Sequence, residues 1–467
     1  MKKFFKILLS ALCAALIAVP ALFCVACDPE KEEEPEGSDP IEVVDYASQL
    51  KLDLSSNTKK QEVTVRQFID GDTTHFDPVK NSTLTKYNAA DFEETLGYIK
   101  ARYLAINTPE STGKIEEYGK KASKFTHSKL ETAESIIVES NDGNWNIDST
   151  GSRYLLWVWY KPAGATDYIN LNVQILQEGL AIASATANNR YGSIASAALQ
   201  QAKALKLNVH SGEPDPDFFY GDAIPLTMRE LRCHFADYSD MKVAVEGVVT
   251  ACYSDSAYVE SFDEESGRYF GVAVYYGASA SGDVLSILSI GNLVKVVGTA
   301  SYYEAGGTYQ ISGVKYNPYK PDAADNCQLI STGHEASFTE VDIDNIYNDV
   351  SYDFVVEGED EEAKIETVTL KYGEAILSTS VSLTNLKVKS IYTTEKGESK
   401  GAMSITCVTS GGHEIVVRTT VLKDETGKTV TADAYLNKTL NVKGVFAKYE
   451  GSYQIVCYLP SQLTEVA

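Results

Sequence analysis

The chain has 467 residues, of which 65 are acidic and 41 basic, giving a formal net charge of −24. Its hydrophobic and charged fractions, 44% and 23%, are those of globular proteins and exclude a fibrous or mostly disordered chain. The length predicts about three domains. The acidic balance excludes attraction of nucleic acid to the molecule as a whole, so any such attraction must be local.

The first 27 residues are expected to be a lipoprotein signal peptide. Three lysines precede an apolar run at 7–26, and a small residue stands directly before Cys27. This ending resembles a bacterial lipobox, although Cys24 stands where that pattern prefers leucine. Cleavage before Cys27 would leave a lipidated N-terminal cysteine and anchor the chain on the extracellular face of the bacterial cell envelope. An uncleaved anchor helix and ordinary signal cleavage are the alternatives.

Charge is distributed unevenly along the rest of the chain. Residues 28–57 carry 10 acidic and 2 basic side chains, which predicts a solvated acidic tether. Residues 58–212 carry 17 of each sign, whereas residues 213–467 carry 38 acidic and 19 basic side chains. The stretch 58–212 is therefore the least acidic part of the mature chain.

The stretch 58–212 has strand-like patterns first and helix-like patterns later. Alternating apolar residues predict strands at 62–70, 99–107 and 152–161. One-sided apolar stripes predict helices at 116–130, 172–183 and 191–207. Residues 213–221 are rich in Gly, Pro and acidic side chains, which indicates a linker between domains.

Beyond the linker the chain reads almost wholly as strands, and it contains an internal repeat. The segment 292–316 parallels 438–458, with Gly298 matching Gly444. Each copy reads as two strands joined by a short turn that contains glycine, and another set of strand patterns precedes each copy.

The repeat resembles a pair of OB-fold barrels, at 222–320 and 367–467. The acidic stretch 321–366 between them is expected to be a linker or an added hairpin. The fold class that follows is mainly β, with an α+β first domain and two OB-like barrels after it.

Three short segments carry the residues that suggest chemistry. Asp70 and Asp72 bracket a glycine at a strand end, Arg102 and Glu110 flank a turn, and Arg153 opens a strand. Singly, each has a structural explanation, either a hairpin turn or an exposed salt bridge. Together, in this order and followed by helical segments, they resemble the active-site set of the micrococcal (staphylococcal) nuclease family. The resemblance covers residues from Val63 to Val209.

That resemblance implies an OB-type five-stranded barrel with helices and gives roles to three side chains. Glu110 would be the general base that takes a proton from water. Arg102 and Arg153 would clamp the phosphate, because a planar guanidinium can bind two oxygens at once. The implied activity is hydrolysis of phosphodiester bonds in DNA or RNA.

The family also implies a calcium site. Asp72, Asn107 and the backbone carbonyl of Thr108 correspond to its ligands. Asp70 and Thr73 would not bind the metal themselves but would hold these ligands in position. The family has an aspartate where this chain has Asn107, so the site has one negative charge fewer and lower expected affinity. Millimolar calcium outside the cell could still fill it.

A second departure lies at 184–189, where the tyrosines that contact the nucleotide in the family have no counterpart. Two functions therefore compete. The first is a membrane-anchored, extracellular, calcium-dependent nuclease. The alternative is a weak or inactive nuclease-fold lipoprotein that serves as a binding module or scaffold.

The two OB-like barrels have several possible roles. Their tyrosines near the repeated hairpins could form a stacking platform for nucleic acid, or could simply fill cores and strand faces; these are Tyr302, Tyr303, Tyr309, Tyr449 and Tyr453. The acidic charge favours the second reading, and contact with a protein partner is a further alternative.

Five cysteines follow Cys27, and none forms a CxxC pair. We interpret them mainly as small buried apolar residues, with one disulfide as an alternative.

Overall fold

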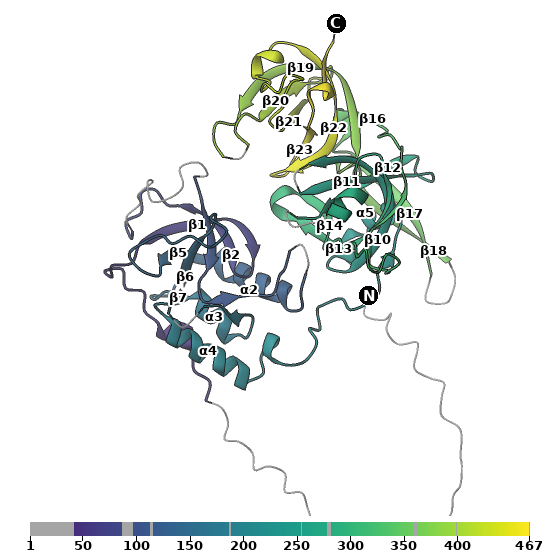
Figure 1. Ribbon diagram of the computed structural model, residues 1–467. Coiled ribbons are helices and arrows are strands. Elements are labelled where there is room, and N and C mark those ends of the chain that lie inside the picture. The colour runs from purple at the N-terminus through teal and green to yellow at the C-terminus, as the bar shows by residue number, and fades with distance from the viewer. Residues whose placement is uncertain are drawn as a thin grey trace, which may run out of the picture. The chain divides into compact units, whose positions relative to one another are not determined.

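The protein is described by a computed structural model (Figure 1) at residues 42–85, 97–112, 115–185, 188–253, 255–277, 282–357, 363–397 and 399–466. The expected signal peptide, Cys27 and the first part of the tether lie outside these residues. From residue 43 onward the chain belongs to one compact unit. Within the described ranges, no helix has the length and apolar character needed to cross a membrane.

The first domain is a closed five-stranded barrel, as the resemblance implied. Its strands follow the order β3-β2-β1-β5-β6, and parallel pairing of β3 with β6 closes the barrel. The strands are β1 (Lys60–Asp70), β2 (Thr73–Pro78), β3 (Ile99–Tyr103), β5 (Ala133–Ser140) and β6 (Tyr154–Pro162). Trp157, Trp159 and Phe76 are fully buried in its core, so the aromatic run of β6 anchors the barrel.

Helices cover this barrel close to where the sequence predicted them. They are α2 (Gly119–Glu131), α3 (Leu171–Gln177) and α4 (Gly192–Ala204), with the short α1 (Tyr46–Gln49) packed beside α3. Helix α2 begins later than expected because Tyr118 takes a left-handed φ of 64°. Helix α3 ends earlier than expected because Gly179 has a φ of 68°, which terminates the helix.

Two short strand pairs complete the first domain. Strand β4 (Ile106–Asn107) pairs with β8 (Ile182–Ala183), which fixes the chain segment just after β3. Strand β7 (Ile169–Asn170) extends the barrel sheet from β6.

The second barrel repeats this topology. Its order is β13-β14-β12-β11-β10, with β10 and β13 closing the barrel and β12 parallel to β14. Its strands are β10 (Lys242–Tyr253), β11 (Ser256–Asp263), β12 (Arg268–Tyr275), β13 (Leu293–Tyr303) and β14 (Thr308–Ser312). The added elements are β9 (Ile224–Pro225), α5 (Met228–Cys233), α6 (Phe235–Tyr238), α7 (Gly282–Ile287) and β15 (Gln328–Ser331).

The third barrel has the same order again, β19-β20-β21-β23-β22, closed by β19 and β22. Its strands are β19 (Ser380–Thr393), β20 (Met403–Val408), β21 (Glu414–Thr419), β22 (Thr439–Tyr449) and β23 (Ser452–Cys457). The short strands β16 (Thr339–Glu340) and β24 (Leu463–Glu465) flank it. The expectation of two OB-like barrels after an α+β barrel is therefore confirmed.

The internal repeat has a physical basis at its paired glycines. A Cβ atom on Gly298 would lie 2.4 Å from the carbonyl oxygen of Ser312, and one on Gly444 would lie 2.5 Å from that of Val456. Both glycines sit where neighbouring strands approach too closely for a side chain. The sequence repeat therefore marks the same strand crossing in both barrels.

Between these barrels lies a two-stranded hairpin of β17 (Asp349–Glu357) and β18 (Ala363–Lys371), followed by α8 (Tyr372–Ala375). The stretch 321–366 was expected to be a linker or a hairpin, and the hairpin strand β18 continues past its end. Tyr352 of β17 packs in the core of the second barrel.

The third barrel covers the outer face of β11 and β12. A Cβ atom on Gly271 would lie 2.4 Å from the carbonyl oxygen of Ser378, so glycine permits this close approach. The Glu260 Oε2 atom accepts a 2.6 Å hydrogen bond from the Ser380 amide. These contacts leave no room for a ligand on this part of the face.

The five described cysteines are free thiols, and all but Cys252 are buried. Cys407 and Cys457 belong to the core of the third barrel, in agreement with their interpretation as small apolar residues.

Candidate active site

The turn between β1 and β2 carries the two aspartates of the first motif. Gly71 lies between them, and a Cβ atom there would lie 2.9 Å from the side chains of Thr108 and Ala122. The Thr126 hydroxyl of α2 donates a 2.6 Å hydrogen bond to the Gly71 carbonyl. Glycine therefore allows both the 108 loop and α2 to pack against the turn.

Asp72 is 5% exposed and is the centre of the site. Its Oδ2 atom accepts a 2.9 Å hydrogen bond from the Thr108 amide, and its Oδ1 atom accepts a 3.1 Å bond from the Thr73 hydroxyl. The Arg102 guanidinium forms an ion pair with the same carboxylate and donates a 2.5 Å hydrogen bond to Asn107 Oδ1. The fold thus brings Asp72 together with Thr108, which lies 36 positions further along the chain.

The side-chain oxygens of Asp72 and Asn107 converge on a single cation, the Arg102 guanidinium. Such a pair of hard oxygen donors has the chemistry that calcium accepts. Asp72 and Asn107 are therefore the side chains that would hold a calcium ion, and both now contact the guanidinium. The set includes only one carboxylate, and across the described ranges no group of three His, Cys, Asp or Glu side chains converges in a way that could hold a metal.

Asp70 points into the protein behind this centre. Its Oδ1 atom accepts hydrogen bonds from the Gly71 amide at 2.7 Å and from the amide and hydroxyl of Ser111 at 3.2 and 2.6 Å. Burial, together with the charges of Asp72 and Glu110, raises the pKa of Asp70 to about 7 despite these bonds. Ser111 was not among the residues predicted from the sequence, although it directly follows Glu110.

Glu110 is exposed and is held in place through its backbone. Its amide donates a 3.3 Å hydrogen bond to Glu116 Oε2, and its carbonyl accepts a 2.9 Å bond from the Glu116 amide. A Cβ atom at Gly119 would lie 2.1 Å from the Glu110 carbonyl oxygen. Glu116 and Gly119 therefore set the position of the 110 loop, and neither was singled out by the sequence motifs.

Arg153 directly precedes β6, in which Leu155 pairs with Arg102 of β3. Its Nε atom donates a 2.7 Å hydrogen bond to Asp148 Oδ2. Burial alone would raise the pKa of Asp148, but bonds from Thr150 and Arg153 outweigh it and lower the pKa. No hydrogen bond or ion pair among the residues the structure describes joins Arg153 to Glu110 or Arg102. The two candidate clamps lie on the seam that closes the barrel but are held by different partners.

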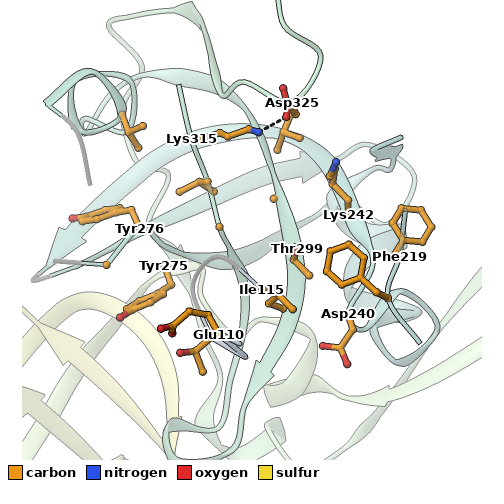
Figure 2. A pocket seen from close by; sticks show the side chains of 18 of the residues that line it. Glu110, Ile115, Phe219, Asp240, Lys242, Tyr275, Tyr276, Thr299, Lys315 and Asp325 are labelled. Atoms are coloured by element: carbon orange, nitrogen blue, oxygen red, sulfur yellow. Dashed lines mark ion pairs between the residues drawn. The ribbon is translucent and has the colours of Figure 1, made fainter. Parts of the chain in front are cut away.

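The Glu110 side chain lines a cleft of about 1020 Å³ (Figure 2). The other walls come from the segment 218–220 and from the second barrel, including Lys242, Tyr275 and Lys315. The exposed Glu110 carboxylate is therefore open to whatever enters this cleft.

Of the five tyrosines near the repeated hairpins, Tyr309 and Tyr453 are engaged within the protein, whereas Tyr302, Tyr303 and Tyr449 are exposed. The Glu374 carboxylate accepts hydrogen bonds from Lys448 at 2.6 Å and from the Tyr453 hydroxyl at 2.9 Å. The guanidinium of Arg232 stacks 3.9 Å from the centre of the Tyr309 ring. Tyr309 and Tyr453 therefore serve packing between the second and third barrels, and the packing alternative holds for these two residues.

Fold and site together define a nuclease-fold, OB-type barrel. Residues 100–211 match the family model described as "Staphylococcal nuclease homologue". The resemblance predicted from the sequence is thereby confirmed for this segment, which runs from β3 to the end of the helical part. The matched range begins after the turn that carries Asp70 and Asp72, so the structure alone links that turn to the domain. No curated protein matches the chain.

Proposed function

We propose that this protein is an extracellular, lipid-anchored, calcium-dependent nuclease that hydrolyses phosphodiester bonds of DNA or RNA. The observation that carries the proposal is the convergence of Asp72, Arg102 and Asn107, at the start of the loop that also carries the exposed Glu110. A staphylococcal-nuclease-type segment at 100–211 supports the hydrolase class. Anchoring through Cys27 rests on the lipobox-like sequence.

Each residue then has a chemical task. Glu110 takes a proton from the attacking water, because its carboxylate is exposed at the cleft. Arg102 and Arg153 stabilise the negative charge that develops on the phosphate oxygens. Bound calcium, held by Asp72, Asn107 and the Thr108 carbonyl, would supply further positive charge beside the phosphate.

Arg102 has to exchange partners during this chemistry. Its guanidinium now contacts both Asp72 and Asn107, so a phosphate has to compete with these oxygens for its donors. A planar guanidinium has five N–H donors, which lets it keep one protein partner while it binds the phosphate.

The test is cleavage of single-stranded and duplex DNA and of RNA by residues 28–467, with several millimolar calcium or with chelator. We expect calcium-dependent cleavage that Glu110→Gln abolishes. Glu131→Gln, a change of the same kind on the exposed end of α2, should retain full activity. Absence of calcium-dependent cleavage would rule out the nuclease. Retained activity in Glu110→Gln would rule out its role as the base.

The alternative function is a nuclease-fold binding or scaffold lipoprotein. It is favoured by Asn107, which removes one charge from the candidate metal site, and by the contact of Arg102 with both candidate ligands. A protein that binds nucleic acid but cleaves it under no calcium concentration would support this alternative.

Localisation requires a separate experiment. Cys27→Ala expressed in a bacterium should move the protein from the membrane fraction to a soluble fraction, because the lipid attachment site is lost. A variant that remains in the membrane fraction would contradict anchoring by a lipid at Cys27.

A further inference from the structure

We propose that the cleft beside Glu110 binds a single strand of nucleic acid on the second barrel and leads it to the candidate catalytic carboxylate. The assignment deepens the proposed function by naming its preferred substrate, and the direction of the strand rests on that function. The binding itself is argued from the lining of the cleft.

The cleft is large, and its lining combines rings with charges. Its volume of about 1020 Å³ is at the upper end of the range for small-ligand sites. Six aromatic side chains line it, namely Phe218, Phe219, Tyr220, Tyr275, Tyr276 and Tyr316. Every base has a flat face that stacks on such rings, so this lining suits unpaired bases of any sequence.

Two lysines provide the positive charge. Figure 2 shows Lys242 and Lys315 on one side of the hollow and Glu110 with Tyr275 on another. Lys315 pairs with Asp325, whereas no ion pair among the residues described here involves the Lys242 ammonium. Lys242 is therefore the cation available to a phosphate, and Lys315 can be shared with Asp325.

The acidic residues of the cleft are partly compensated. Asp240 forms a 3.1 Å ion pair with Lys120 of α2, and Asp325 is paired with Lys315. The carboxylate left without an ion pair among the described residues is that of Glu110, which the proposed function places at the scissile phosphate. The local balance at the far end of the cleft therefore favours a phosphate, although the chain as a whole is acidic.

The usual ligand face of an OB barrel is not available in this second barrel. Such barrels commonly bind nucleic acid on the outer face of their second and third strands. Here those strands are β11 and β12, and the third barrel covers them through Ser378 and Ser380. Tyr253 is also stacked on Tyr458, with ring centroids 5.0 Å apart. The cleft is the aromatic surface of this barrel that remains open next to Glu110.

A single strand fits this lining better than a duplex does. In a duplex the base faces are stacked on one another, so the rings of the cleft would find no free face to contact. A single strand can place its bases on the rings and its phosphates near Lys242. We therefore expect single-stranded DNA or RNA to be the preferred class of ligand.

The test measures binding to the full mature chain carrying Glu110→Gln, so that hydrolysis does not interfere. A fluorescent oligonucleotide is titrated at low salt, first as a single strand and then as a duplex of the same sequence. We expect single strands to bind about tenfold more tightly. Lys242→Gln with Lys315→Gln should weaken single-strand binding by about tenfold and lower the salt dependence by about 0.7 per lost phosphate contact.

The matched control is Lys387→Gln with Lys396→Gln, which removes the same charge from exposed positions of the third barrel and its flanking loop. It should change binding by less than about twofold. Tyr275→Ala should also weaken binding, because a stacking ring is lost, and Tyr302→Ala, outside the cleft, should not. Equal binding of duplex and single strand, or equal loss in cleft and control variants, would overturn the proposal.

A second measurement separates this inference from the proposed function. Hydrolysis of the small diester bis(4-nitrophenyl) phosphate needs the catalytic residues but no strand in the cleft. Failure of the unsubstituted protein to hydrolyse either the diester or nucleic acid would count against the nuclease, while the binding titration still reports on the cleft. If the cleft is the strand site, Lys242→Gln slows oligonucleotide cleavage several-fold and leaves diester hydrolysis unchanged; an equal slowing of both would overturn it.

Discussion

The first and second barrels share one topology but use it differently. Both run in the same strand order, with the third strand parallel to the last. In the first, the turn and strand ends around β2 and β3 hold Asp72 and Arg102 in contact with each other. In the second, the equivalent strands β11 and β12 carry Gly271 and Glu260 and are covered by the third barrel. The two barrels therefore share a strand topology. Whether that topology can bind a ligand depends on the side chains of the loops and on whether another domain covers the strands.

The charges follow the same division. The stretch 58–212 is neutral, whereas residues 213–467 carry twice as many acidic as basic side chains. A phosphate is therefore repelled less by the first barrel than by the others. Substitutions in each barrel can test whether activity and architecture are separated in this way.

The largest effect is expected from Arg102→Ala in the first barrel. It removes a cation that contacts both Asp72 and Asn107, so cleavage should fall on the order of 100- to 1000-fold. The measurement is the rate of oligonucleotide cleavage at saturating calcium. Arg66→Ala, which breaks an exposed ion pair with Asp77 on the same barrel, should leave the rate within about twofold. Similar losses in both variants would contradict a specific role for Arg102.

A substitution in the second barrel should change the stability of the protein rather than its activity. Gly271→Ala places a Cβ atom 2.4 Å from a carbonyl oxygen of the third barrel, and we expect a loss of about 2 kcal/mol in the free energy of unfolding. Urea denaturation measures it. Gly282→Ala, where a Cβ atom would meet nothing within 4 Å, is the control and should be nearly neutral. A neutral Gly271→Ala would show that the two barrels do not pack this closely.

Glu260 adds a pH dependence to the same contact. Burial raises its pKa to about 7, so the folded chain keeps a proton that the unfolded chain loses above about pH 4.5. Its contribution to stability therefore falls as pH rises from about 4.5 to 7, by up to about 1.4 kcal/mol per pH unit, and is constant above. Glu260→Gln should remove this slope. Thermal unfolding from pH 5 to 8 tests it, and parallel curves for both proteins would refute the assignment.

The smallest effect is expected from Asn107→Asp. The added carboxylate should raise calcium affinity about tenfold, because affinity follows the number of charged ligands. Calorimetric titration of calcium into the Glu110→Gln protein measures it. Asn144→Asp, an exposed change on the same barrel, should leave the affinity unaltered. An unchanged calcium affinity in Asn107→Asp would show that Asn107 is not a ligand of the metal.

The sequence predicted the architecture well where periodic patterns or repeated glycines carried it. The long strands β1, β10 and β19 and the match of Gly298 with Gly444 follow directly from alternation and close strand crossing. Helix ends were less predictable, because Tyr118 and Gly179 take left-handed conformations that depend on the surrounding fold.

The residues of the candidate site also fall into those that the sequence predicted and those that it did not. Asp72, Arg102 and Asn107 form a predicted cluster that the fold brings together. Ser111 and Gly119 were missed, because their roles depend on contacts with Asp70 and with the Glu110 carbonyl that no spacing rule encodes. The sequence also did not predict that β11 and β12 are covered, because the covering segment lies more than 100 residues away in the chain.

The parallel seam between β3 and β6 has a consequence for folding. It joins Ala101, Arg102 and Tyr103 to residues 154–156, and α2 and β5 lie between these two segments in the chain. Such non-local pairing is slow to form. Both arginines lie along this seam, so the two candidate phosphate clamps take their final positions only when barrel closure is complete. Recovery of activity during refolding should therefore follow the last structural phase rather than the formation of individual helices.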